Sequence, residues 1–64
     1  MCESNVYMKT NGVEELIMEN VAVVTPIGSG RFLLKGLLGE SKEVSGTIED
    51  INLMGHKITI ASLA

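Results

Sequence analysis

The sequence predicts an all-β protein, a small SH3-like or Sm-like barrel of about six short antiparallel strands. Two observations lead to this fold class. Turn-forming residues recur every several positions, and the short runs between them are rich in β-branched residues, several with alternating apolar and polar positions. At 64 residues the chain has room for one small core, so residues 1–64 are expected to form a single domain.

The first three strands are predicted from alternation and from the turns that separate them. The six expected strands are residues 3–9, 13–18, 21–25, 31–37, 43–51 and 56–61. In the first, Val6 and Met8 share one face. Asn11-Gly12 is typical of the type I′ turn of a β-hairpin and joins the first strand to the second. Pro26 is expected to end the third strand, because proline cannot donate a hydrogen bond to a sheet.

The last three strands are predicted from their apolar patterns. The fourth is almost continuously apolar, which suggests burial on both faces. In the fifth, Val44 and Ile48 are expected to face inward, and Gly46 suggests a bulge or bend that lets a barrel strand curve. In the sixth, Ile58 and Ile60 share one face.

Charge and hydropathy exclude several classes of function. The net charge is −3, the five basic residues are dispersed, and Tyr7 and Phe32 are the only aromatic residues. Nucleic-acid binding is therefore expected to be weak, since it normally needs a basic stripe or stacking aromatic residues. No apolar run approaches the roughly 20 residues of a membrane span, and no leader peptide is visible. A cytoplasmic protein with a reduced thiol is expected.

The short chain is expected to need further stabilisation. A domain of this size buries only about 60% of its unfolded surface, and small scaffolds usually add a disulfide, a metal or a partner subunit. With one cysteine, an internal disulfide is excluded. A homodimer with two-fold symmetry is expected. Its interface should use part of an apolar set that exceeds what one barrel can bury: Phe32, Leu33, Leu34, Leu37 and Leu38.

Cys2, directly after Met1, is the principal candidate for a metal ligand. If Met1 is removed, Cys2 offers a thiolate and an α-amine that close a five-membered chelate ring, and the backbone nitrogen of Glu3 is the next donor. Nitrogen and thiolate in one plane suit Ni(II) or copper. If Met1 is kept, the thiolate and nearby backbone nitrogens form a different chelate. The competing interpretation is that Cys2 is a small buried apolar residue.

His56 is a second candidate ligand, and it would require the first and last strands to be neighbours. The competing interpretation is a solvated histidine or a turn cap. A cysteine–histidine nucleophilic pair would need an orienting third group and a pocket, and a barrel this small has little interior to spare. The protein is therefore not expected to be an enzyme.

Several segments carry a resemblance to a known family. They are residues 1–7, 18–21, 39–44 and 51–58. The chain resembles the CooT family, short cytosolic nickel-binding proteins associated with nickel insertion into carbon monoxide dehydrogenase. The specific part is the pattern Met-Cys-x-[Ser/Ala]-x-Val, which Met1, Cys2, Ser4 and Val6 satisfy. The resemblance implies a small dimeric β-barrel, with Cys2 as the nickel ligand and the two amino termini close together.

Three functional hypotheses follow. The first is a metallochaperone or nickel store that supplies Ni(II) to a nickel enzyme such as carbon monoxide dehydrogenase. The alternative is a metal-free Sm-like module that binds RNA or protein. A third, weaker hypothesis is a thiol redox protein. Titration with Ni(II), with and without Cys2, distinguishes the three.

Overall fold

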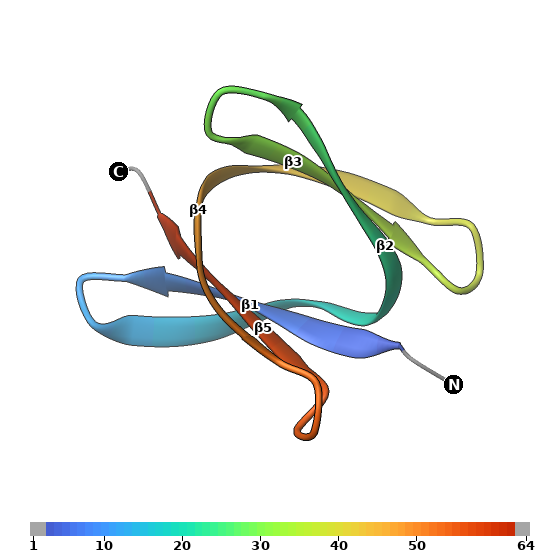
Figure 1. Cartoon of the computed structure of the whole chain (residues 1–64), viewed down its shortest axis with the longest axis horizontal. Helices are drawn as coiled ribbons and strands as arrows, with labels where there is room; N and C mark the ends of the chain where they lie inside the picture. Colours follow the sequence, from blue (N-terminus) through green and yellow to red (C-terminus); the bar gives the residue numbers. More distant parts are fainter. Residues whose placement is uncertain (1–2, 63–64) are drawn as a thin grey trace.

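Five strands close into one barrel in the computed structural model, which describes residues 3–62 (Figure 1). The strands are β1 (Ser4–Thr10), β2 (Val13–Gly28), β3 (Arg31–Gly36), β4 (Ser41–Asn52) and β5 (Lys57–Ser62). Each strand pairs with the next along the chain, and β1 pairs with β5. The predicted fold class, a small all-β barrel, is confirmed.

The strand count is five rather than about six, because the second and third predicted strands are one continuous strand, β2. Asn20 lies inside β2 with a φ of 54°, a left-handed conformation that asparagine tolerates better than most residues. Its backbone N–H donates to Oδ1 of Asn5 on β1, 3.2 Å away. The resulting bend lets β2 pair with β1 as far as Val21 and with β3 from Val21 onward.

Pro26 does not end a strand, contrary to the sequence prediction. It lies within β2, opposite Phe32 of β3. The part of β2 that follows Val21 pairs with β3 alone. Proline is accepted in a strand where its missing N–H faces an unpaired edge, and this half of β2 has such an edge.

The barrel closes through a parallel pairing of β1 with β5, in register from Asn5 opposite Lys57 to Lys9 opposite Ala61. The other four strand pairs are antiparallel, as predicted. The first hairpin is confirmed, since Asn11 and Gly12 have φ values of 53° and 80°. A type I′ turn requires positive φ at both of its central residues.

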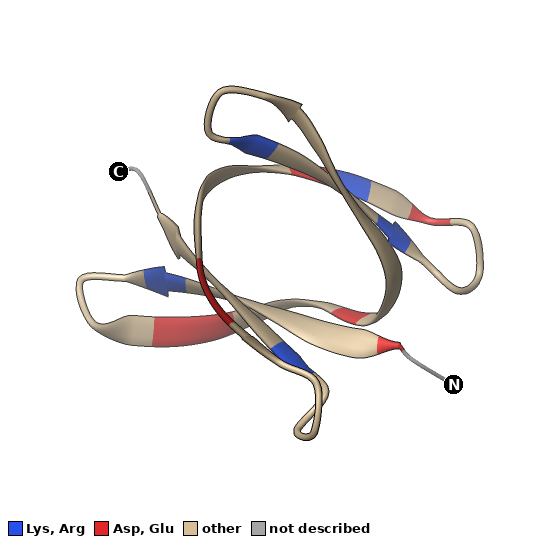
Figure 2. Ribbon diagram, in the orientation of Figure 1, with Lys and Arg blue, Asp and Glu red and all other residues tan. Residues whose placement is uncertain are grey.

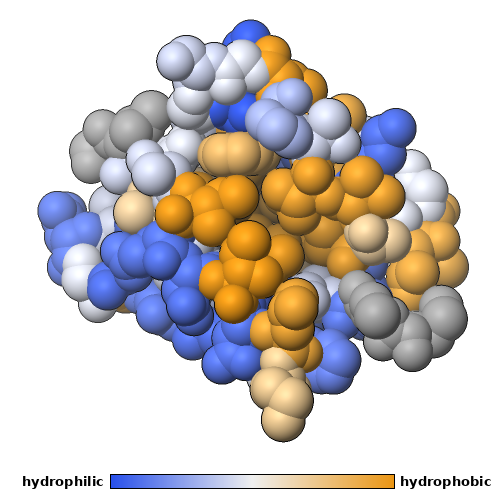
Figure 3. Space-filling view, viewed as in Figure 1, coloured by the Kyte–Doolittle hydropathy of each residue, from blue (hydrophilic) through white to orange (hydrophobic). Residues whose placement is uncertain are grey.

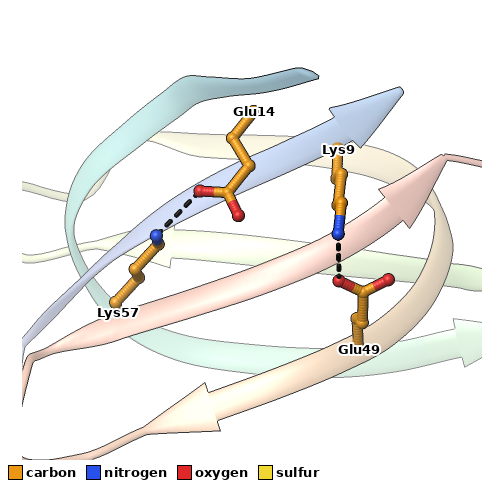
Figure 4. Close-up of polar contacts among 4 residues, drawn as sticks. All are labelled: Lys9, Glu14, Glu49 and Lys57. Carbon is orange, nitrogen blue, oxygen red and sulfur yellow. Dashed lines mark hydrogen bonds and ion pairs between the residues drawn. The ribbon is translucent and has the colours of Figure 1, made fainter. Parts of the chain in front are cut away.

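Two ion pairs cross the closing strands on the outside of the barrel (Figure 4). The Nζ atom of Lys57 on β5 lies 2.7 Å from Oε1 of Glu14 on β2 and 4.9 Å from the centre of the Tyr7 ring on β1. The hydrogen bond between Lys57 and Glu14 lowers the pKa of Glu14 and raises the pKa of Lys57, so both groups stay charged at neutral pH. The Nζ atom of Lys9 lies 3.2 Å from Oε1 of Glu49 on β4. The Lys57–Glu14 pair spans β1, and the Lys9–Glu49 pair spans β5. Both ion pairs therefore cross the parallel pairing of β1 with β5.

The core takes one buried apolar side chain from each strand. These are Val6, Val21, Leu34, Val44 and Ile60. A second group is partly buried against them: Met8, Ile17, Met18, Val24, Phe32, Ile48 and Ile58. The inward-facing residues predicted for β1, β4 and β5 belong to these two sets.

The apolar segment of β3 is buried on one face only, so the prediction of burial on both faces is wrong. Leu34 is fully buried, whereas Leu33 is half-buried and faces outward between Thr25 and Glu43. In the turn that follows, Leu37 is exposed and Leu38 is 92% exposed. The surplus apolar surface predicted for this segment therefore lies mainly at the β3–β4 turn.

Candidate metal centre

Cys2 lies outside the described residues, so the site is built from the point where the described chain begins. Glu3 immediately precedes β1, and Ser4 opens that strand with a buried side chain. β1 lies between β5 and β2. The start of β1 is thus flanked by neighbours on both sides, and Figure 1 shows it between the β3–β4 and β4–β5 turns.

Hydrogen bonds brace this strand start from both sides. The Asn5 N–H donates to the His56 carbonyl at 2.8 Å. The Asn5 side chain accepts from the Asn20 N–H, and the Asn20 carbonyl accepts from the Leu37 N–H at 3.1 Å. The series connects the β4–β5 turn, β1, the bend of β2 and the β3–β4 turn. Three segments that are distant in sequence therefore hold the backbone of β1 at Asn5, three residues after Cys2 in the sequence.

His56 occupies the last position of the β4–β5 turn. Its φ is 54°, and the turn is also held by the Gly55 N–H, which donates to Oδ1 of Asn52 at 2.8 Å. The structure meets the condition set for His56 as a ligand, since the first and last strands are neighbours and the His56 carbonyl is bonded to Asn5. The imidazole belongs to an exposed residue. Whether it binds a metal together with Cys2 stays a prediction.

Glu3 is half-buried, and its Oε2 atom is buried without a hydrogen-bond partner. Within residues 3–62 no other side-chain nitrogen or oxygen is buried without a hydrogen-bond partner. The prediction for Glu3 concerned its backbone nitrogen, and that stays a prediction. The unpartnered carboxylate oxygen is a feature that the sequence did not indicate.

Residues 3–62 contain no group of three or more histidine, aspartate and glutamate side chains placed to hold a metal ion. The sequence has two pairs of adjacent acidic residues, Glu14-Glu15 and Glu49-Asp50. Glu14 forms an ion pair with Lys57, and Glu49 forms one with Lys9. Glu15 and Asp50 are exposed, and the charge of Asp50 adds to the effect of Glu14 in raising the pKa of Lys57. A conventional carboxylate or histidine site is therefore absent from the described part of the chain.

Exposed apolar side chains surround this end of the barrel. Leu53 and Met54, in the β4–β5 turn, are 75% and 94% exposed, and Ile51 precedes them on β4. Leu37 and Leu38 lie on the other side of the β1 start. Figure 3 shows hydrophobic side chains gathered in the middle of this face and continuing over the β4–β5 turn at the bottom of the view.

Comparison with known families decides the classification. Residues 1–61 match the family model described as CO dehydrogenase accessory protein CooT. The chain belongs to the CooT family. The matched segment includes Cys2, Glu3 and His56, and nearly the whole barrel lies within it.

One solved structure supports the assignment to CooT. It is a crystal structure from Carboxydothermus hydrogenoformans whose protein was assigned as CooT. It superposes with a TM-score of 0.88 at 27% sequence identity, over 98% of this chain and 100% of the other. No curated protein matches the sequence. No helix within residues 3–62 is long and apolar enough to cross a membrane.

Proposed function

We propose that this protein is a nickel-binding metallochaperone or nickel store that supplies Ni(II) to CO dehydrogenase. The family match carries the proposal, because it assigns the chain to the accessory proteins of that enzyme and includes Cys2. An accessory protein serves the maturation of its client, so the role is delivery or storage rather than catalysis. The protein acts in the cytoplasm, where its lone thiol stays reduced.

Nickel is the cargo in this proposal, and the donors proposed to hold it are the Cys2 thiolate and backbone nitrogens that include that of Glu3. Thiolate and nitrogen donors in a plane suit low-spin Ni(II). The hydrogen bonds of Asn5 fix the strand that follows the donors.

The alternative, a metal-free module that binds RNA, finds less support. Three of the five basic side chains, Lys9, Arg31 and Lys57, are engaged in ion pairs with carboxylates. Figure 2 shows the basic residues dispersed over several strands rather than gathered on one face. RNA affinity depends on releasing counterions through clustered basic residues. A thiol redox role has no support beyond the presence of Cys2.

Titration with Ni(II) tests the proposed function. The parent is expected to bind nickel with a thiolate-to-metal charge-transfer absorption. Cys2→Ser should lose that absorption and most of the affinity, while its thermal unfolding stays unchanged. Binding should also weaken as the pH falls, because protons compete with the metal for the thiolate. His56→Ala is the control and should bind as the parent does. Equal nickel affinity in Cys2→Ser and the parent would refute the proposal.

We also propose that two copies associate through the apolar end of the barrel, around the start of β1. Large exposed apolar surface on a small protein commonly marks an interface, and a chain of 64 residues gains stability from a partner. The leucines of the two flanking turns, Leu38 and Leu53, supply this surface. Association there would bring the β1 starts of the two copies together, and both Cys2 thiolates are proposed to contribute to one nickel ion.

Light scattering at micromolar concentration tests the association. The parent should have twice the chain mass of 6.9 kDa. A double variant, Leu38→Asp with Leu53→Asp, should be monomeric, because a buried unpaired carboxylate is strongly unfavourable. Val13→Asp is the matched control, since Val13 is exposed on the β1–β2 hairpin, and it should remain dimeric. A monomeric parent, or a dimeric double variant, would contradict this interface.

A further inference from the structure

The β3–β4 turn projects from the side of the barrel (Figure 1), and Leu38 at its tip is 92% exposed. The backbone N–H groups of residues 36–39 nevertheless all have acceptors. The Gly36 N–H donates to the Glu40 carbonyl at 2.8 Å, and the Gly39 N–H donates to the Gly36 carbonyl at 3.2 Å. The Leu37 N–H donates to a carbonyl in the bend of β2, and the Leu38 N–H donates to Oε1 of Glu40, both at 3.1 Å. Leu38 is therefore exposed on an ordered turn.

The Glu40 side chain folds back over this turn and lies against Gly36. A Cβ atom added at Gly36 would collide with Oε1 of Glu40 and lie 2.9 Å from its Oε2. Gly36 pairs with Val21 of β2, and it is not among the glycines with a positive φ. Its backbone conformation therefore does not require glycine. The space left by the missing side chain is occupied by the Glu40 carboxylate.

An exposed leucine contributes little to the stability of the monomer, because its apolar surface stays in water. In association, by contrast, a group that is already held in its bound conformation loses less entropy when a partner covers it. We propose that the contact between Gly36 and Glu40 holds Leu38 as an ordered anchor for a second copy of this chain. Glu40 is the positioning residue, and Gly36 provides the space for its carboxylate. This role rests on the association of two copies proposed above.

Charge favours a second copy as the occupant of this surface. The β3–β4 hairpin, residues 31–45, contains three basic and two acidic residues, whereas the rest of the chain contains two basic and six acidic residues. Lys35 and Lys42, which flank the turn, form no ion pair within residues 3–62. Surfaces of opposite charge favour association. A second copy therefore offers carboxylates to two lysines that their own chain leaves without an ion pair in its described part.

Glu40→Ala tests the role of the carboxylate. The dissociation constant of the dimer, measured by sedimentation of a dilution series, should rise about tenfold, because the turn then has to be ordered on association. Glu40→Gln keeps an acceptor oxygen and should stay within about threefold of the parent. Both variants remove the same negative charge. The difference between them therefore reports the hydrogen bond rather than the charge.

Gly36→Ala disrupts the same contact without changing the charge. The three atoms nearest the added methyl group all belong to the flexible end of the Glu40 side chain, so the carboxylate is displaced while the backbone stays in place. This variant should weaken association as Glu40→Ala does. The double variant should be no weaker than either single variant, because both substitutions remove one interaction. Gly28→Ala is the matched control: a Cβ there comes no closer than 3.4 Å to Arg31, and its association should equal that of the parent.

Hydrogen exchange distinguishes a positioning role from a general loss of stability. At dilutions where the parent is monomeric, the Leu38 amide should exchange faster in Glu40→Ala, because it has lost its acceptor. The urea midpoint at the same dilution should stay close to that of the parent, because the contact lies in an exposed turn. A purely structural role would lower that midpoint and leave the exchange of Leu38 no more affected than that of other amides.

The positioning role is overturned if Glu40→Ala or Gly36→Ala associates as tightly as Gly28→Ala. It is also overturned if Glu40→Gln is as weak as Glu40→Ala, if the effects of the double variant add, or if the Leu38 amide exchanges equally in parent and Glu40→Ala. A monomeric parent refutes the association itself and this role with it. A dimeric parent with unaffected variants refutes the role of Glu40 alone, so the two failures are distinguishable.

Discussion

Replacing Leu34 with alanine is expected to lower the free energy of unfolding by about 2–5 kcal/mol. Leu34 is 0% exposed and stands at the centre of β3, among the buried side chains contributed by the other four strands. A domain of 64 residues has a total stability of about 3–10 kcal/mol at typical values per residue. The substitution should therefore leave a large fraction of the protein unfolded. Urea denaturation followed by circular dichroism measures the effect.

Leu16→Ala is the matched control for this experiment. It makes the same chemical change on β2, where Leu16 is 43% exposed opposite Tyr7. A cross-strand pair of this kind contributes about 1 kcal/mol or less. If the two variants have equal midpoints of unfolding, the barrel core is not centred on Leu34.

The sequence was sufficient for the fold class because local signals agree with the barrel in most strands. Asn11-Gly12 forms the predicted hairpin, and the alternation around Val44 and Ile60 identifies their buried faces correctly. These features depend on neighbours in sequence. Turn type and two-residue alternation can be identified from the sequence alone.

The continuity of β2 was not accessible in this way. The segment around Asn20 has the appearance of a break between two strands, since asparagine favours turns. In the structure the left-handed Asn20 is retained inside a strand by the side chain of Asn5, which is 15 residues away in sequence. The parallel contact between β1 and β5 is equally non-local. Neither contact leaves a periodic signal.

In the candidate site, too, local features could be predicted from the sequence and non-local contacts could not. The sequence pointed to Cys2 by its position, and to Glu3 and His56 as possible additional donors. The hydrogen bond that joins Asn5 to the carbonyl of His56 exists only because the barrel closes. The buried oxygen of Glu3 depends on three-dimensional packing. Donor type can be inferred from sequence, whereas burial and missing partners require coordinates.

Gly46 was predicted to mark a bulge or a bend in its strand. The irregularity in the pairing of β4 with β5 falls between Ile48 and Asp50, so the bulge is not at Gly46. Gly46 lies where β4 stops pairing with β3, after Ser45, and begins to pair with β5. Gly46 is needed because β5 passes too close for a side chain. A Cβ atom there would collide with the Ala61 carbonyl oxygen and lie 2.6 Å from Cγ2 of Ile60.

Gly46→Ala is therefore expected to lower the free energy of unfolding by about 1–3 kcal/mol, the usual cost of forcing extra volume into a packed region. The Ala61 oxygen belongs to the backbone, so relief requires β5 to move away from β4. The Gly46 N–H also donates to the Gly30 carbonyl at 2.8 Å, which holds β4 against the β2–β3 turn. Faster hydrogen exchange should appear at the amides that pair β4 with β5, together with a lower urea midpoint.

Gly55→Ala is the matched control, since a Cβ at that position comes no closer than 3.4 Å to Asn52 and the site is exposed. It should leave the unfolding free energy unchanged or raise it by up to about 1 kcal/mol, because alanine restricts the unfolded chain. The two variants share one chemical change and differ in the space around the added methyl group. Equal stabilities for both would show that β5 does not press against β4 at Gly46, and that the barrel is more loosely closed at this seam.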